Sequence, residues 1–161
     1  MIEKLITKQA RPWGRRRAVM GKTNWTRVFL GGLLAGVVFI VLGFAAYAIY
    51  MEKLYTPAIE ALGLSTQITA WLYILAVVMA LISGILAVWL YSAIRPRYGA
   101  GPKTAVIAGI AFYVLSGLLP AISISSMGMF PTNVLVIDGI TALVMSVVAT
   151  LIGAWVYKEQ E

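Results

Sequence analysis

Four long apolar runs dominate the chain, and short polar segments separate them. They cover residues 28–50, 68–94, 105–124 and 134–157, and only the last contains a charged side chain, Asp138. A helix needs about 20 apolar residues to cross the hydrocarbon core of a bilayer. The runs reach this length and lack the charged stripe of a helix on a soluble protein. They therefore predict four membrane-spanning helices.

Composition supports a polytopic membrane protein of the all-α class. In hydrocarbon, backbone polar groups must pair within the protein, so only helices or closed barrels span a membrane. Continuous apolar runs favour helices, because barrel strands alternate. The chain is 61% hydrophobic and 12% charged, against roughly 45–50% and 25% in soluble domains. We expect a four-transmembrane-helix bundle, and exclude a soluble globular enzyme or an ordinary nucleic-acid-binding domain.

The charges predict an orientation. Residues 1–26 form a basic lead-in, which we expect to be a cytoplasmic or interfacial segment in front of a transmembrane domain at 27–161. Twelve of the thirteen Lys and Arg residues lie on the side of the membrane that holds both termini. The positive-inside rule therefore predicts a multi-pass protein of a bacterial inner membrane with both termini in the cytoplasm. The expected partners are the lipid bilayer and, at the inner face, anionic headgroups. The first apolar run exceeds the 7–15 residues of the apolar core of a signal peptide, which predicts an uncleaved anchor.

Small residues recur at the same spacing in the second and fourth runs. Each position in one run matches a position 66 residues later in the other, and the same offset relates Trp89 to Trp155 and Tyr91 to Tyr157. The small residues of the second run are Ala76, Ala80, Ser83 and Ala87, and those of the fourth run are Ala142, Ser146, Ala149 and Gly153. The pattern predicts two repeated helical hairpins related by an approximate two-fold axis along the membrane normal. A chance match between helices rich in alanine and glycine is the alternative.

Steps of four, three and four residues place these small side chains on one seam of each helix. Helices in lipid associate through close packing, which small residues permit. We therefore expect the second and fourth spans to pack closely, with Gly32 and Gly36 providing a similar contact on the first span. Alternatively, one seam faces a membrane-protein partner or a second copy of the chain.

Two residue types with versatile chemistry are missing, because the chain has no cysteine and no histidine. Thiolate and imidazole metal sites are thereby excluded, as is the commonest general base. We expect no metal, no cofactor and no enzymatic activity, since a catalytic constellation is hard to build from the few acids that remain.

Asp138 is the only acid within a predicted span. It lies roughly 7 Å below the outer end of the fourth run, at about 1.5 Å per residue. Intramembrane acids are candidates for functional residues, here for binding a cation or transferring a proton. Near a helix N-terminus, however, the helix dipole alone stabilises an anion. The expected neighbours are Ser123, Ser125, Thr132 and Asn133.

The predicted loops offer a second candidate site. The inner loop at 95–102 carries Arg95 and Arg97, and Lys103 follows the helix start predicted at Gly101-Pro102. These cations could hold a lipid phosphate, or they are only positive-inside anchors on a turn. The outer loops are expected at 51–67 and 125–133, with residues 131–133 as a cap for the last span.

Residues 95–99 and 101–105, together with 24–28 and 31–36, resemble a group of small bacterial four-span membrane proteins. The resemblance covers about residues 24–157 and implies architecture without activity. The sequence favours a structural or accessory subunit of a membrane complex. The alternatives are a small oligomeric transporter or channel that uses Asp138, and a protein that binds lipid headgroups.

Overall fold

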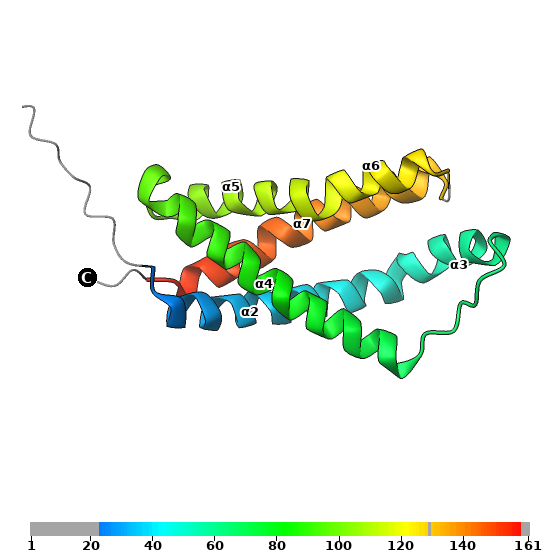
Figure 1. Cartoon of the computed structure of the whole chain (residues 1–161), viewed down its shortest axis with the longest axis horizontal. Coiled ribbons are helices and arrows are strands. Elements are labelled where there is room, and N and C mark those ends of the chain that lie inside the picture. Colours follow the sequence, from blue (N-terminus) through cyan, green and yellow to red (C-terminus); the bar gives the residue numbers. More distant parts are fainter. Residues whose placement is uncertain (1–22, 129, 159–161) are drawn as a thin grey trace, which may run out of the picture.

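The computed structural model describes residues 23–128 and 130–158, which form four long helical spans (Figure 1). The spans consist of α2 (Trp25–Ala46), the π-helical η1 (Tyr47–Met51) and α3 (Glu52–Ala61); α4 (Ala70–Tyr98); α5 (Pro102–Tyr113), the π-helical η2 (Val114–Leu118) and α6 (Leu119–Ser126); and α7 (Thr132–Val156). Each span is long and apolar enough to cross a membrane. The predicted four-helix membrane fold is confirmed. Residues 1–22, most of the predicted basic segment, lie outside the described residues.

The first span is longer than the hydropathy pattern predicts. We expected the helix to end at residue 50 and a loop to follow over 51–67, but the helix continues through η1 and α3 to Ala61. Polar residues such as Glu52 and Lys53 are good helix formers. A fall in hydropathy therefore marks the end of the apolar stretch and not the end of the helix, and the predicted loop was wrong over 51–61.

The connection between α4 and α5 is shorter than predicted. The helix runs through Pro96 to Tyr98, so the expected loop at 95–102 shrinks to residues 99–101. Gly99 and Gly101 have φ angles of 85° and 136°, which side chains with a Cβ rarely adopt, and this permits the tight turn. Pro102 occupies the first turn of α5, as predicted. The Thr104 hydroxyl donates to the Gly99 carbonyl at 2.7 Å and closes the turn.

The start of the fourth span differs from the prediction as well. The residue in the N-cap position of α7 is Pro131, and no side chain caps the helix there. The expected side-chain cap from residues 131–133 was therefore wrong. The backbone amides of Val134 and Leu135 instead donate to the Pro131 carbonyl, at 3.1 and 3.3 Å.

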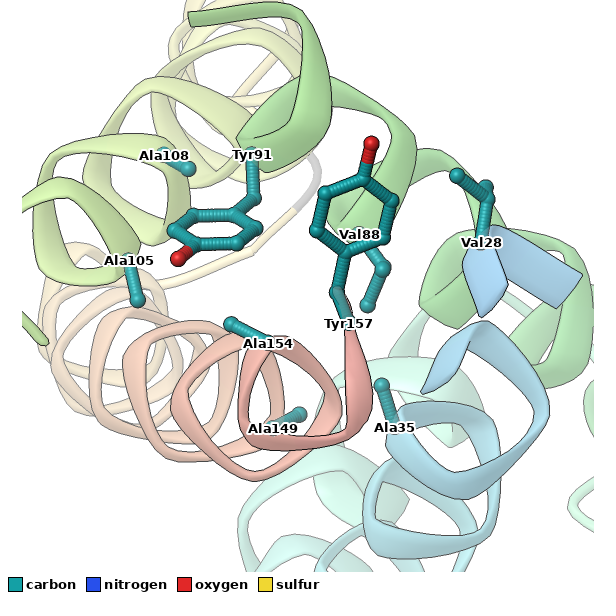
Figure 2. Packing of buried hydrophobic residues seen from close by; sticks show 9 residues of the cluster. All are labelled: Val28, Ala35, Val88, Tyr91, Ala105, Ala108, Ala149, Ala154 and Tyr157. Atoms are coloured by element: carbon teal, nitrogen blue, oxygen red, sulfur yellow. The ribbon is translucent and has the colours of Figure 1, made fainter. Parts of the chain in front are cut away.

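We call the end of the bundle that holds Trp25, Tyr98, Pro102 and Val156 the terminal end, and the opposite end the loop end. The helix α4 crosses α2 obliquely near the middle of the bundle and lies apart from the other helices towards the loop end (Figure 1). The buried core lies in the half towards the terminal end, where four spans contribute mostly small side chains and two tyrosines (Figure 2). It comprises Val28, Ala35, Val88, Tyr91, Ala105, Ala108, Ala149, Ala154 and Tyr157.

Glycines let the backbones approach closely between α2 and α4. A Cβ added at Gly84 would overlap the backbone of both Gly32 and Gly36. A Cβ on Gly32 would lie 2.5 Å from the Cα of Ile85, and one on Gly36 would lie 2.8 Å from the Cα of Leu81. Because dispersion falls off steeply with distance, such contact is the main attraction available between helices in lipid.

The outward face is strongly apolar and fits lipid. Trp155 is 86% exposed and Trp25 is 56% exposed, in keeping with aromatic residues near a membrane interface. Tyr91 and Tyr157, the tyrosines related by the offset of 66, are buried at 4% exposure each. Patches of exposed apolar side chains on this scale are a liability in water but carry no penalty in hydrocarbon.

Candidate functional site

A cavity of about 620 Å³ opens in the half of the bundle towards the loop end. Residues from all four spans line it, and most of the lining is apolar. Six aromatic side chains form much of the wall: Phe39, Phe44, Tyr47, Tyr73, Phe112 and Tyr113. Two ring pairs connect the spans, with centroids 6.0 Å apart for Phe44 and Tyr73 and 6.2 Å apart for Phe39 and Phe112.

The small residues predicted as packing seams have two different surroundings: some line the cavity, and others are buried between helices. In the cavity wall they leave space: Ala76, Ala80 and Ser83 on α4, and Ala142 and Ser146 on α7. Nearer the terminal end the same seams are buried between helices: Ala87, Ala149 and Gly153. There, a Cβ added at Gly153 would lie 2.5 Å from Cγ2 of Val88, so α4 and α7 touch. The two helices therefore diverge from a contact near the terminal end to opposite walls of the cavity.

Asp138 lies in the cavity wall and is half-buried. It is six residues from the start of α7, about 9 Å into the helix at the usual rise. Tyr55 on α3 is close enough to Asp138 for the two side chains to interact electrostatically. The ring of Tyr55 packs edge-on against Phe130, with centroids 5.3 Å apart. Asp138 thus has a phenol from the first span nearby and also borders the cavity.

A second polar contact lies one turn along α7 from Asp138. The Tyr50 hydroxyl donates to Oγ1 of Thr141 at 2.5 Å, and the Thr141 hydroxyl donates to the Ile137 carbonyl at 3.0 Å. From the third span, the Tyr113 hydroxyl approaches Gly139, where an added Cβ would lie 3.2 Å from the oxygen. Phenols from the first and third spans therefore converge on the same two turns of the fourth span.

Both π-helical segments contribute to the cavity wall, η1 with Tyr47 and Met51 and η2 with Ser116 and Gly117. In an α-helix, Pro120 could not donate to the carbonyl of Ser116 and would clash with it. The wider π turn at η2 accommodates this defect within the span. Short π segments occur often at functional sites.

The neighbours predicted for Asp138 stay a prediction, and the structure adds Tyr55, which sequence reasoning missed. The Ser123 hydroxyl donates to the Leu119 carbonyl of its own helix at 3.2 Å. Tyr55 was not among the predicted neighbours, because it lies beyond the apolar run in a segment that we expected to be a loop. No feature of the hydropathy pattern identifies it.

The basic residues proposed to hold a lipid phosphate lie at the terminal end. The guanidinium of Arg95 lies over the Tyr157 ring, with its central carbon 5.4 Å from the centroid. Arg97 and Lys103 are exposed. A headgroup site here stays a prediction, and Arg95 would have to serve both the ring and the phosphate.

Within residues 23–128 and 130–158, no three Asp or Glu side chains gather as they would around a metal ion. No protein-family model matches the chain, and no significant match is found among curated proteins or solved structures. The molecule is therefore characterised by its own geometry: a multi-pass helical membrane protein with an aromatic cavity and a carboxylate in the cavity wall.

Proposed function

We propose that the protein is a small transporter that binds an apolar or amphipathic molecule within the membrane. One observation carries this proposal: a cavity of about 620 Å³ that all four spans line. Ligand sites typically occupy about 300–1,000 Å³ and combine an apolar lining with a few polar groups. The cavity has this composition, with Asp138 and Thr141 among its polar residues.

All four spans of a single chain contribute to the wall of the proposed site. The cavity lies within segments long and apolar enough to span a membrane, so a molecule dissolved in the bilayer can reach it without crossing water. Close packing of Gly153 against Gly31 and Val88 keeps α2, α4 and α7 together near the terminal end, while α4 lies apart from the other helices towards the loop end (Figure 1). Such an arrangement gives a carrier one rigid half and one half in which helices can move.

The proposal includes an orientation. Among the described residues, the terminal end carries five cations and the loop end carries one, Lys53. The five are Arg27, Arg95, Arg97, Lys103 and Lys158. By the positive-inside rule, the terminal end faces the cytoplasm and the cavity lies in the outer half of the membrane. The proposed ligand therefore exchanges with the outer leaflet.

An accessory subunit, which the sequence alone favours, remains the other prediction. It rests on the absence of catalytic chemistry and not on a particular contact. The cavity favours the transporter, because a volume of this size with an apolar wall and a few polar groups is typical of a ligand site.

The test uses the full chain in nanodiscs and a neutral apolar fluorophore, N-phenyl-1-naphthylamine, with empty nanodiscs as background. We expect saturable binding, and uptake of the same probe into proteoliposomes. Ala142→Trp should fill the cavity and weaken binding about tenfold or more. The matched control is Val144→Trp, two residues away on the exposed face of α7.

Each variant is accepted only if its circular dichroism and size-exclusion profile match those of the wild type. If Ala142→Trp does not fold, Ala76→Trp fills the cavity from α4 instead. The proposal is wrong if the wild type shows no saturable binding. It is also wrong if the cavity-filling and control variants bind alike.

A further inference from the structure

We propose that the ligand of this cavity is an amphipathic organic cation, with Asp138 as its counter-ion. The inference rests on the transporter proposal and adds the chemical class of the substrate. Among the described residues that line the cavity, Asp138 alone has a side chain that carries a formal charge. A carboxylate in hydrocarbon is costly unless a partner of opposite charge or a proton compensates it. A ligand with one positive charge provides that compensation.

The position of Asp138 suits this role. Asp138 lines the cavity, so its carboxylate is available to a molecule bound there. Tyr55 is close enough to interact electrostatically with Asp138. The ring of Tyr55 packs against Phe130. A cationic ligand in the cavity would therefore meet the carboxylate directly.

The aromatic wall adds a second attraction for cations. The face of an aromatic ring is negative, so a cation within about 6 Å of its centroid is attracted, more strongly when water is excluded. Six rings line the cavity, and they come from the first, second and third spans. A bulky cation with apolar substituents can contact several rings at once while its charge is paired with Asp138.

Other ligand classes fit the cavity less well. An anion would meet the Asp138 charge in a medium of low dielectric constant, where repulsion is strong. A bare Mg²⁺ or Ca²⁺ ion requires six or more oxygen ligands. The described lining provides one carboxylate and a few hydroxyl groups, which are too few. An amphipathic cation satisfies both the single charge and the apolar volume.

The test compares two ions of nearly the same size and shape and opposite charge, tetraphenylphosphonium and tetraphenylborate. Binding is measured on the full chain in nanodiscs of uncharged lipid, with empty nanodiscs subtracted. We expect the phosphonium to bind at least about tenfold more tightly than the borate. Asp138→Asn should abolish this preference, whereas Asp138→Glu should retain it.

Glu60→Gln is the matched control, because Glu60 is an exposed acid near the loop end that does not line the cavity. It should leave the preference for the cation unchanged. Equal binding of the two ions, or an unaltered preference in Asp138→Asn, would overturn the inference while saturable binding of the neutral probe would still support a transporter. If none of the three probes binds saturably, both proposals fail.

Discussion

Tyr91 and Tyr157 meet edge to face at the terminal end, with ring centroids 5.9 Å apart and ring planes at 89° (Figure 2). Their numbers differ by the repeat offset of 66, so positions that the sequence pattern relates are in contact between α4 and the end of α7. Arg95 lies over the ring of Tyr157, and the Gly101 amide donates to the Tyr91 hydroxyl at 3.3 Å. The pair thus links α4, the turn before α5, and the chain after α7.

Tyr157→Ala should destabilise the bundle by about 3 kcal/mol, because it removes a buried aromatic ring and the cation–π contact of that ring with Arg95. The measurement is the free energy of unfolding in a reversible SDS titration of the protein in mild micelles, followed by circular dichroism. Trp155→Ala is the control, since Trp155 is 86% exposed and should cost much less. Similar losses for the two variants would contradict the packing described for Tyr157.

Gly84→Leu should separate α2 from α4. The added side chain would overlap the backbones of Gly32 and Gly36, which cannot move aside as a flexible side chain can. We expect a loss of at least about 2 kcal/mol in the same titration, because overpacking of a tight contact is costly. Ala93→Leu adds the same bulk to an exposed position of α4 and should be nearly neutral. Wild-type stability of Gly84→Leu would show that the two helices are not in close contact.

The hydrogen bond between Tyr50 and Thr141 can be isolated by a double-mutant cycle with Tyr50→Phe and Thr141→Val. Hydrogen bonds between membrane helices contribute about 0.6 kcal/mol on average and up to about 1.7 kcal/mol. Because this bond is partly buried, we expect a coupling free energy within that range. Thr141→Val also removes the bond to the Ile137 carbonyl, and the cycle cancels that loss. Strictly additive effects would mean that the two hydroxyl groups do not interact.

The orientation can be tested by labelling single introduced cysteines, because the chain contains no cysteine of its own that would react. We expect a membrane-impermeant maleimide to label S65C on intact cells, since Ser65 lies exposed in the connection between α3 and α4. K158C should react only after permeabilisation, because the terminal end is predicted to face the cytoplasm. The opposite labelling pattern would reverse the proposed orientation and place the cavity in the inner half of the membrane.

The hydropathy pattern predicts the number, class and approximate centres of the spans because the bilayer itself imposes the length of an apolar helix. It does not predict helix ends in polar sequence. α3 and the last turns of α4 lie in segments that we expected to be loops. Their stability comes from ordinary backbone hydrogen bonding and from contacts such as that of Tyr55 with Phe130, neither of which hydropathy measures.

Asp138 is a site candidate from sequence alone, since an acid in an apolar run is costly and easy to recognise. Its surroundings are not. Tyr55 reaches it from a segment 83 positions earlier in the chain, because the first helix continues past its apolar run. The small-residue seams were identified as packing surfaces, but at Ala80 and Ala142 they border the cavity.

By itself, the sequence determined that this chain forms four helices in a membrane and that Asp138 stands alone among their apolar residues, because the cost of exposing polar backbone or charge to lipid depends only on local composition. The tertiary structure decided where the small-residue seams of α4 and α7 pack against other helices and where they border the cavity. Helix divergence depends on how Gly32 and Gly36 fit against Gly84 in the middle of α4, and that fit is a property of facing surfaces. The same geometry brings Tyr55 to Asp138 and leaves a cavity beside them.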